Sequence, residues 1–326
     1  MLSKFFTKLY DIIDFEMKIP ITQSKEWQKL QDDLGEESFL TREKDFHYLA
    51  ILKTTPVGNY LYCPYGPIAN DVSSFKSAIK SLEKLANDHQ AIFIRVEPFE
   101  ENYAKSLPKY TQKSTDLNPK ETWLLDLTGN DDDLKQKLPS RLLRYYKQAE
   151  KKGITIKISH NPDDAHCLLD LQKALAKEKG INTFSEDYYK AQISQPFSTL
   201  YLLEYTNPEE KKKNEIIAAG LVFDDKDTRY NLQGAQTEEG RKLHATGILT
   251  IQLILDAKEK GLKTFDFWGI APEGAPKSHP WAGFTNFKKT FKGEEFDHAG
   301  TYDIVLKPFK YKIYQLTRKL NRLIRK

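Results

Sequence analysis

Two neighbouring stretches decide the fold: Phe265-Asp-Phe-Trp-Gly-Ile270 and His279-Pro-Trp-Ala-Gly-Phe-Thr-Asn-Phe-Lys-Lys-Thr-Phe-Lys-Gly-Glu294. The first predicts a buried strand that stops at Gly269, where the backbone can turn or lie close to a ligand. The second places Lys288 at helical spacing among phenylalanines. A lysine near a strand end, with apolar rings around it, can stabilise negative charge in a reaction. The alternative is that the rings are core residues and Lys288 is a solvated helix residue.

Length and composition set the broad class. The chain has 326 residues, enough for two domains, and its net charge of +4 does not by itself call for nucleic acid. The two cysteines, Cys63 and Cys167, are too few for a disulfide scaffold or a cysteine zinc site and fit a reducing compartment. Neither a signal peptide nor an apolar run that could span a bilayer is visible. We expect a cytoplasmic monomer.

Both halves of the chain show the same predicted order of elements, namely helices, hairpin strands, a long helix and a buried strand. The long helix and buried strand are Ser73–Asn87 with Ala91–Val96 in the first half, and His244–Lys260 with Thr264–Trp268 in the second. This order is typical of a GNAT-like acyltransferase module, seen twice. We therefore predict an α/β (α+β) fold of two such modules.

A polar run at 128–133 marks the predicted boundary, which gives domains 1–133 and 134–306. The second domain is expected to open with one basic helix, Leu134–Lys152, that ends at Gly153 in a left-handed cap. Its last strand is expected at Asp297–Val305.

The two ends of the chain carry amphipathic patterns. From Lys307 to Lys326 every charged side chain is basic, which suits the phosphates of RNA or of lipid headgroups, or a solvated helix face. Apolar residues repeat at helical spacing at both ends, so these segments either rest on an anionic membrane surface or pack on their own domain. The two stripes are Leu2, Phe5, Phe6, Leu9, Ile12 and Ile13, and Ile313, Leu316, Leu320, Leu323 and Ile324.

Five segments in order carry a family resemblance. They are Gln23-Ser-x-x-Trp27, Leu61-Tyr-Cys-Pro-Tyr-Gly-Pro67, Ile94-Arg-Val-Glu-Pro98, the basic helix that follows Leu138-Pro-Ser-Arg141, and the stretch 265–294. Together they span most of the chain, and the chain resembles the FemABX family of peptidoglycan aminoacyl transferases. None of the motifs is specific alone; their order is what carries the resemblance.

The resemblance implies an architecture and an activity. The architecture is two tandem GNAT-like domains, with helix 307–326 packing back on the first and no coiled-coil arm, since no extended heptad pair interrupts the second half. The activity is transfer of an amino acid from aminoacyl-tRNA to an amine of a peptidoglycan precursor, either lipid II or the UDP-MurNAc-pentapeptide. It implies no cofactor and no metal.

The resemblance also implies roles for individual residues. Lys288 matches the family's functional lysine, which stabilises the oxyanion or the leaving ribose oxygen, and Phe287 shapes the pocket wall. Glu97 matches an acidic position that orients or deprotonates the attacking amine; the alternative is an ion pair with Arg95. Tyr188 matches a tyrosine that hydrogen-bonds the substrate.

Three positions depart from the armless relative. A phosphate-binding lysine is replaced by Gln31, although Lys29 is near, and a phosphate-binding arginine by Phe184. A substrate tyrosine aligns with Leu232, although Tyr230 is close. The loss of both cations favours a lipid-linked precursor, or another amine, over the UDP-linked one.

Basic residues of the helix 134–152 are candidates for contact with the tRNA backbone, and a solvated helix face is the alternative. These candidates are Arg141, Arg144 and Lys147.

Two other functions stay open. One is a GNAT-type N-acyltransferase that uses acyl-CoA on a small amine, which coenzyme A would protect from heat. The run 240–247 disfavours it, because a pyrophosphate loop is normally glycine-rich and this one holds only two glycines. The other is a non-catalytic relative that binds RNA or a membrane through its basic tail.

Overall fold

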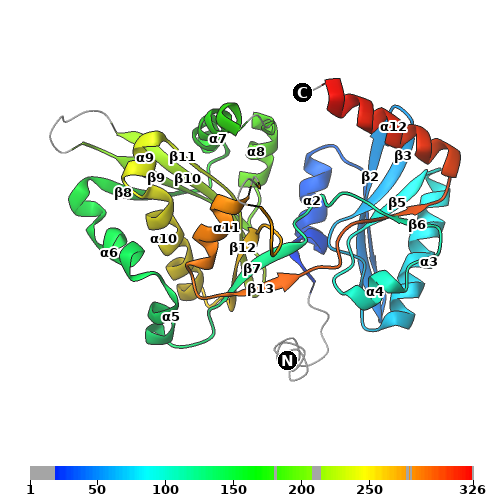
Figure 1. Ribbon diagram of the computed structural model, residues 1–326, viewed down its shortest axis with the longest axis horizontal. Coiled ribbons are helices and arrows are strands. Elements are labelled where there is room, and N and C mark those ends of the chain that lie inside the picture. Colours follow the sequence, from blue (N-terminus) through cyan, green and yellow to red (C-terminus); the bar gives the residue numbers. More distant parts are fainter. Residues whose placement is uncertain (1–18, 180–181, 208–213, 277–278, 280, 325–326) are drawn as a thin grey trace. The chain divides into compact units, whose positions relative to one another are not determined.

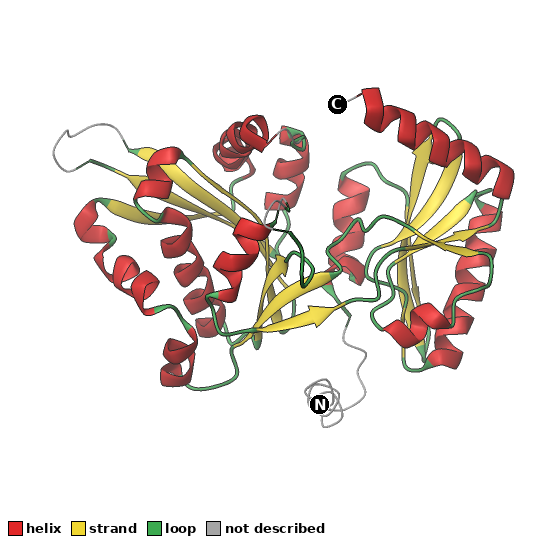
Figure 2. Ribbon diagram, viewed as in Figure 1, coloured by secondary structure: helices red, strands yellow, loops and turns green. Residues whose placement is uncertain are grey.

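The computed structural model of the protein describes residues 19–179, 182–207, 214–276, 279 and 281–324, which form two compact units (Figure 1). Unit 1 contains residues 19–28, 37–115 and 301–324, and unit 2 contains residues 29–36 and the described part of 116–300. Helices and strands are mixed in both units (Figure 2). The stripe expected at the N-terminus lies outside the described residues, as do the side chains of Leu323 and Ile324.

The sheet of unit 1 contains one parallel pair, β3 with β5, and the crossover between them contains helix α3 (Val72–Asp88). Its other pairings are antiparallel. The strand order is β1 (Ser38–Arg42), β2 (Phe46–Thr55), β3 (Gly58–Cys63), β5 (Phe93–Val96), β14 (Tyr302–Val305) and β6 (Thr111–Lys113), with β4 (Ile68–Ala69) on β2.

Helices cover both faces of this sheet. Leu61 and Ile94 join the core formed with α3, whereas the adjacent Tyr60 and Phe93 pack against helix α12 (Pro308–Ile324). Successive residues of a strand point to opposite faces, so α3 and α12 lie on opposite sides. The unit is completed by η1 (Ile21–Gln23), the first part of α2 (Lys25–Asp33), and α4 (Glu101–Lys105).

Unit 2 repeats the plan. Its one parallel pair is β11 with β12, and the crossover contains α9 (Glu238–Lys242) and α10 (Ala245–Glu259). Helix α10 and α6 (Ser140–Gln148) cover one face; α7 (Ala165–Lys179) and α8 (Glu186–Ile193) cover the other (Figure 1). The strand order is β13 (Glu294–Asp297), β7 (Glu121–Asp126), β12 (Thr264–Gly269), β11 (Thr228–Gln236), β10 (Glu215–Asp224), β9 (Ser198–Tyr205) and β8 (Ile154–Ser159).

The fold is therefore the predicted tandem of α/β modules. The longest helices of the described chain, α3 and α12, have 17 residues each, so these ranges contain no coiled-coil arm. Among the described helices, none has both the length and the hydropathy that a bilayer span requires.

The single helix predicted at Leu134–Lys152 is wrong. The segment forms α5 (Asp131–Lys137), α6 and the short η2 (Glu150–Lys152). Leu138 is extended, with φ −88° and ψ 141°, because a residue that precedes proline avoids the helical region, and Pro139 follows it. The predicted end is confirmed, since Gly153 is left-handed with φ 78°.

The single strand predicted at Asp297–Val305 is also wrong. The segment contains the end of β13, in the sheet of unit 2, and β14, in the sheet of unit 1. Gly300, with φ 92°, lies between them. The compact units also divide at 115/116 rather than at the boundary expected after residue 133, because β7 pairs with β12 and β13.

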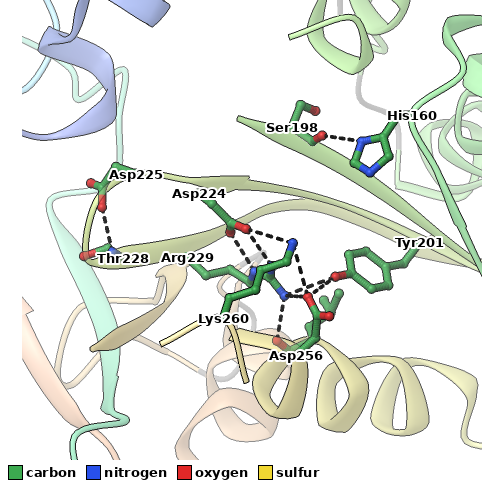
Figure 3. A network of polar contacts seen from close by, with 10 residues as sticks. His160, Ser198, Tyr201, Asp224, Asp225, Thr228, Arg229, Asp256 and Lys260 are labelled. Atoms are coloured by element: carbon green, nitrogen blue, oxygen red, sulfur yellow. Dashed lines mark hydrogen bonds and ion pairs between the residues drawn. The ribbon is translucent and has the colours of Figure 1, made fainter. Parts of the chain in front are cut away.

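Among the described residues, each unit contains one fully buried arginine. In unit 2, Arg229 of β11 donates to Asp224 at 2.6 and 2.7 Å and to Asp256 of α10 at 2.7 Å (Figure 3). The Tyr201 hydroxyl also bonds Asp256, and Lys260 lies 3.5 Å from both carboxylates. This network ties the crossover helix α10 to the β10–β11 hairpin.

In unit 1, Arg95 of β5 donates to both oxygens of Asp303 on β14 at 2.7 Å, and both side chains are 1% exposed. The Tyr311 hydroxyl of α12 donates to the same carboxylate at 2.8 Å. These contacts therefore join β5 to β14 and α12, since Asp303 lies 208 residues beyond Arg95.

Candidate active site at the end of strand β12

The end of β12 is irregular. Its pairing with β7 shifts register between Asp266 and Gly269, and Trp268 is left-handed with φ 64°. A left-handed backbone is unusual for a bulky residue. The Asp266 carboxylate accepts a hydrogen bond from the Trp268 N–H at 2.7 Å, which holds the turn. Strain of this kind concentrates at functional sites.

Gly269 is required by its surroundings. A Cβ atom at this position would lie 2.6 Å from Cγ of Pro119 and 3.2 Å from the ring of Trp281. Only glycine lets the strand end fit between these two side chains. The backbone at Gly269 therefore lies close to two protein side chains of unit 2.

Helix α11 (Ala282–Lys289) brings the lysine to this strand end. Lys288 Nζ donates to the Gly269 carbonyl oxygen at 2.6 Å. The helix is tied to the chain beyond β12 by Thr285, whose hydroxyl accepts from the Ala271 N–H at 2.7 Å. The Lys288 side chain is therefore held in place rather than free in solvent.

The aromatic stripe beside the lysine belongs to the core. Phe291 is fully buried, and its carbonyl accepts from the Trp123 indole at 3.0 Å. Phe287 is half-buried and packs on the same core, with its ring 5.5 Å from that of Phe291. Both rings therefore belong to the core of unit 2.

Burial lowers the pKa of Lys288 from 10.5 to about 8, an effect that the nearby Asp266 carboxylate opposes. With a pKa this close to neutrality, the amine is mostly protonated at pH 7 and can still exchange a proton. Such a group can stabilise an oxyanion as a cation, or give and take a proton.

The second predicted catalytic residue, Glu97, lies in unit 1, directly after β5, and is 2% exposed. It accepts hydrogen bonds from the Tyr62 hydroxyl at 3.1 Å, the Tyr65 N–H at 3.2 Å and the Thr301 hydroxyl at 3.0 Å. The alternative ion pair with Arg95 is not formed, because Arg95 pairs with Asp303. Glu97 is thus a buried, well-bonded carboxylate.

Tyr188 and Phe184, two positions noted in the sequence, come together on unit 2. Their rings stack at 4.3 Å, and Phe184 is 55% exposed. Burial raises the pKa of Tyr188 to about 12, so its hydroxyl stays a donor. A phenyl ring cannot neutralise a phosphate, and the pair forms an aromatic surface instead.

The two remaining predicted substrate-binding residues are Tyr230 and Lys29. Tyr230 is buried, its hydroxyl donates to Asp225 at 2.7 Å, and its ring meets Trp268 edge-on at 6.3 Å. Lys29 is exposed on α2, whereas Gln31 is buried. Tyr230 therefore borders the β12 turn.

The basic residues of α6 gather around a ring that the sequence did not single out. Arg141 and Arg144 lie over Tyr145, 5.5 and 5.6 Å from its centroid, with Lys152 at 5.6 Å. The ring of His244 stacks on that of Tyr145 at 4.2 Å. Lys147 is exposed on the same helix and is not among the cations over this ring.

The signal for this cluster was the i, i+4 spacing of Arg141 and Tyr145. His244 could not be found this way, because it comes from the start of α10, where it is left-handed with φ 59°.

Packing accounts for both glycines of the run 240–247. A Cβ at Gly240 would lie 2.3 Å from the Ile217 carbonyl oxygen, and one at Gly247 would lie 2.6 Å from Leu142. Neither glycine is therefore needed to cradle a pyrophosphate. Among the residues with described positions, no three His, Cys, Asp or Glu side chains form a metal-binding group.

Comparisons with known proteins find a family model that matches part of the chain. The model of the FemAB family matches the part of the chain that contains β12, α11 and Lys288. The match covers residues 201–319. The predicted FemABX resemblance is thus confirmed. No curated protein sequence matches the chain.

Solved structures extend the likeness in fold. The crystal structure of FemX superposes with a TM-score of 0.75 at 16% identity, over 90% of this chain and 94% of that one. The C-terminal domain of a putative lysylphosphatidylglycerol synthetase from Agrobacterium fabrum gives 0.59 at 15% identity, over 92% and 93%. A tandem GNAT protein from the clavulanic acid pathway gives 0.52 at 10% identity, over 82% of each chain. The fold is shared with FemX and with tandem GNAT proteins.

Proposed function

We propose that the protein is an aminoacyltransferase that moves an amino acid from aminoacyl-tRNA to an amine of a peptidoglycan precursor. The observation that carries the proposal is the half-buried Lys288, held 2.6 Å from the Gly269 carbonyl oxygen with its pKa lowered to about 8. The FemAB match over the same segment supports it.

The reaction needs charge stabilisation more than a nucleophile on the enzyme. The acceptor amine attacks the ester carbonyl, a C–N bond forms, and negative charge gathers on the carbonyl oxygen. The bond to the ribose oxygen then breaks, and the proton lost by the amine ends on that oxygen. Protonated Lys288 would stabilise the oxyanion or the leaving oxygen. Because the ester is already activated, no covalent enzyme intermediate is needed.

Glu97 would orient the attacking amine, as the family resemblance implies. Three donors already occupy its carboxylate, so we favour orientation of the amine over proton abstraction. Phe287 and Gly269 would line the reaction site beside Lys288. Tyr188 and Tyr230 would bind the acceptor.

The acceptor we favour is lipid-linked. Phe184 and the buried Gln31 stand where an armless relative carries cations for nucleotide phosphates, so the UDP-linked precursor lacks these partners here. Exposed Lys29, two residues before Gln31, could replace one of them. Lysylphosphatidylglycerol synthetase, a structural neighbour, is named for a lipid product.

The donor tRNA would meet the cations of α6. Arg141 and Arg144, gathered over Tyr145, and Lys147 further along the helix would contact its phosphates. Such contacts position the RNA without reading its sequence.

The test is transfer of radiolabelled amino acids from a mixed aminoacyl-tRNA pool to lipid II and to the soluble UDP-linked pentapeptide, side by side. Lys288→Ala should lower transfer roughly ten- to a thousandfold. Lys289→Ala is the matched control, because Lys289 is exposed and pairs with Glu295 at 2.9 Å. It should transfer like the wild type.

Label in either acceptor, lost with Lys288→Ala only, supports the proposal and identifies the precursor. A folded protein that labels neither acceptor contradicts it. Protection from heat by coenzyme A would then favour the acyl-CoA reaction.

A further inference from the structure

Helix α12 carries an exposed apolar stripe. Phe309 is 77% exposed, Ile313 39%, Leu316 62% and Leu320 58%. Their spacing of four, three and four residues puts them on one face of the helix. Exposed apolar residues that form a continuous patch mark an interaction surface, whereas isolated ones need no explanation.

The opposite face of α12 already has a role in unit 1. Tyr311 is buried, and its ring lies 5.2 Å from that of Phe93. Tyr314 packs on the same phenylalanine at 4.9 Å. At 3.6 residues per turn these tyrosines point away from the Phe309–Leu320 stripe, so the stripe is not needed to hold the helix in place.

Positive charge flanks the stripe. Lys310 lies to one side of it, Lys312 and Lys319 lie to the other, and all three are exposed. The whole segment from Lys307 to Lys326 has eight basic residues and no acidic one. An apolar face bordered by lysines is the pattern of a helix that lies in the surface of an anionic bilayer.

We propose that α12 docks the protein on an anionic lipid surface, with the Phe309–Leu320 stripe in the acyl boundary and the lysines against the headgroups. A second copy of the chain fits less well, because two all-basic helices would repel each other across the stripe. RNA would engage the lysines but leave Ile313, Leu316 and Leu320 without a partner. The inference does not depend on the proposed reaction.

The test is co-sedimentation of the full-length protein with vesicles of phosphatidylcholine alone and of phosphatidylcholine mixed with phosphatidylglycerol. The wild type should pellet with the anionic vesicles, less so as salt is raised. Phe309→Ser/Leu316→Ser should weaken binding by about tenfold or more. Lys310→Gln/Lys319→Gln should weaken it by roughly twentyfold, at a factor of about five for each lysine.

Leu117→Ser/Ile158→Ser is the matched control. Leu117 is 45% exposed and Ile158 48% exposed, and both lie in unit 2. This variant should bind like the wild type. All variants change exposed side chains, and unaltered circular dichroism checks that they fold.

The following outcomes overturn the inference. They are no binding of the wild type to anionic vesicles, equal binding by Phe309→Ser/Leu316→Ser, an equal loss in the control, and a dimer in vesicle-free solution that Phe309→Ser/Leu316→Ser abolishes. The last would make a second copy the occupant. Retained vesicle binding by Lys310→Gln/Lys319→Gln, with loss of tRNA binding, would assign the lysines to RNA and likewise overturn it.

Discussion

Both units contain one parallel strand pair, but the second strand of the pair ends differently in each unit. In unit 1 the second strand of the parallel pair, β5, runs into Glu97, whose carboxylate is fixed by three donors. In unit 2 the equivalent strand, β12, breaks register and ends at Gly269, whose carbonyl receives Lys288. One strand end carries a buried carboxylate held by three donors, and the other holds Lys288, whose pKa burial lowers to about 8. Under the proposed function, the end of β5 would position the acceptor amine and the end of β12 would stabilise the developing charge.

The buried arginines give the largest expected difference in stability. Arg95→Met leaves Asp303, which is 1% exposed, without its cation. We therefore expect the free energy of unfolding to fall by about 3–5 kcal/mol. Arg229→Met leaves Asp224 and Asp256 without this arginine, but the two carboxylates are 18% and 16% exposed and have Lys260 nearby. We therefore expect a smaller fall in the free energy of unfolding, roughly 2–3 kcal/mol. Urea unfolding followed by circular dichroism measures both. A larger loss for Arg229→Met would contradict the ranking.

A methyl group at the end of β12 should disturb the lysine. Gly269→Ala puts a Cβ 2.6 Å from Pro119, so the strand end must move and the carbonyl that holds Lys288 moves with it. We expect transfer to fall roughly tenfold or more, with a stability loss of about 1–3 kcal/mol.

Gly283→Ala is the control for this change. Gly283 lies in the same helix as Lys288, and a Cβ there meets nothing within 4 Å. It should leave transfer unchanged and raise stability by up to about 1 kcal/mol. Equal effects of the two substitutions would show that the strand end does not position the lysine.

The smallest expected effect concerns Glu97, the buried carboxylate of unit 1. Glu97→Gln keeps the shape of the side chain and acceptors for two of the three donors, so an orienting role predicts a loss of transfer below about tenfold. A loss of a hundredfold or more would make Glu97 a base. The exposed Glu100→Gln, three residues on, serves as the control in the same kinetic assay.

Local pattern was enough for most elements and for Lys288. Helix α3, strand β12 and the left-handed Gly153 follow from apolar periodicity and glycine placement. The Phe-Lys-x-x-Phe run predicted a lysine near a strand end, and its contact with Gly269 is at that end.

Long-range pairing was not visible in the sequence. The segment 297–305 looks like one strand, yet its two parts join different sheets, because periodicity does not say which edge a strand meets. The partner of Arg95 is Asp303, 208 residues away, rather than the neighbouring Glu97. The break at Pro139 could have been read locally, since proline disfavours a helical residue before it.

The most direct test of the central claim is the single-turnover transfer rate of wild type and Lys288→Ala as a function of pH. If the protonated lysine is the active form, the ratio of the wild-type rate to the variant rate, which measures the deficit of the variant, is largest below pH 8. It should shrink as pH rises through the pKa of about 8, where the wild type loses its cation. Taking the ratio of the two rates removes the titration of the acceptor amine, which both share. A deficit that is absent, constant, or larger above pH 8 would contradict the account.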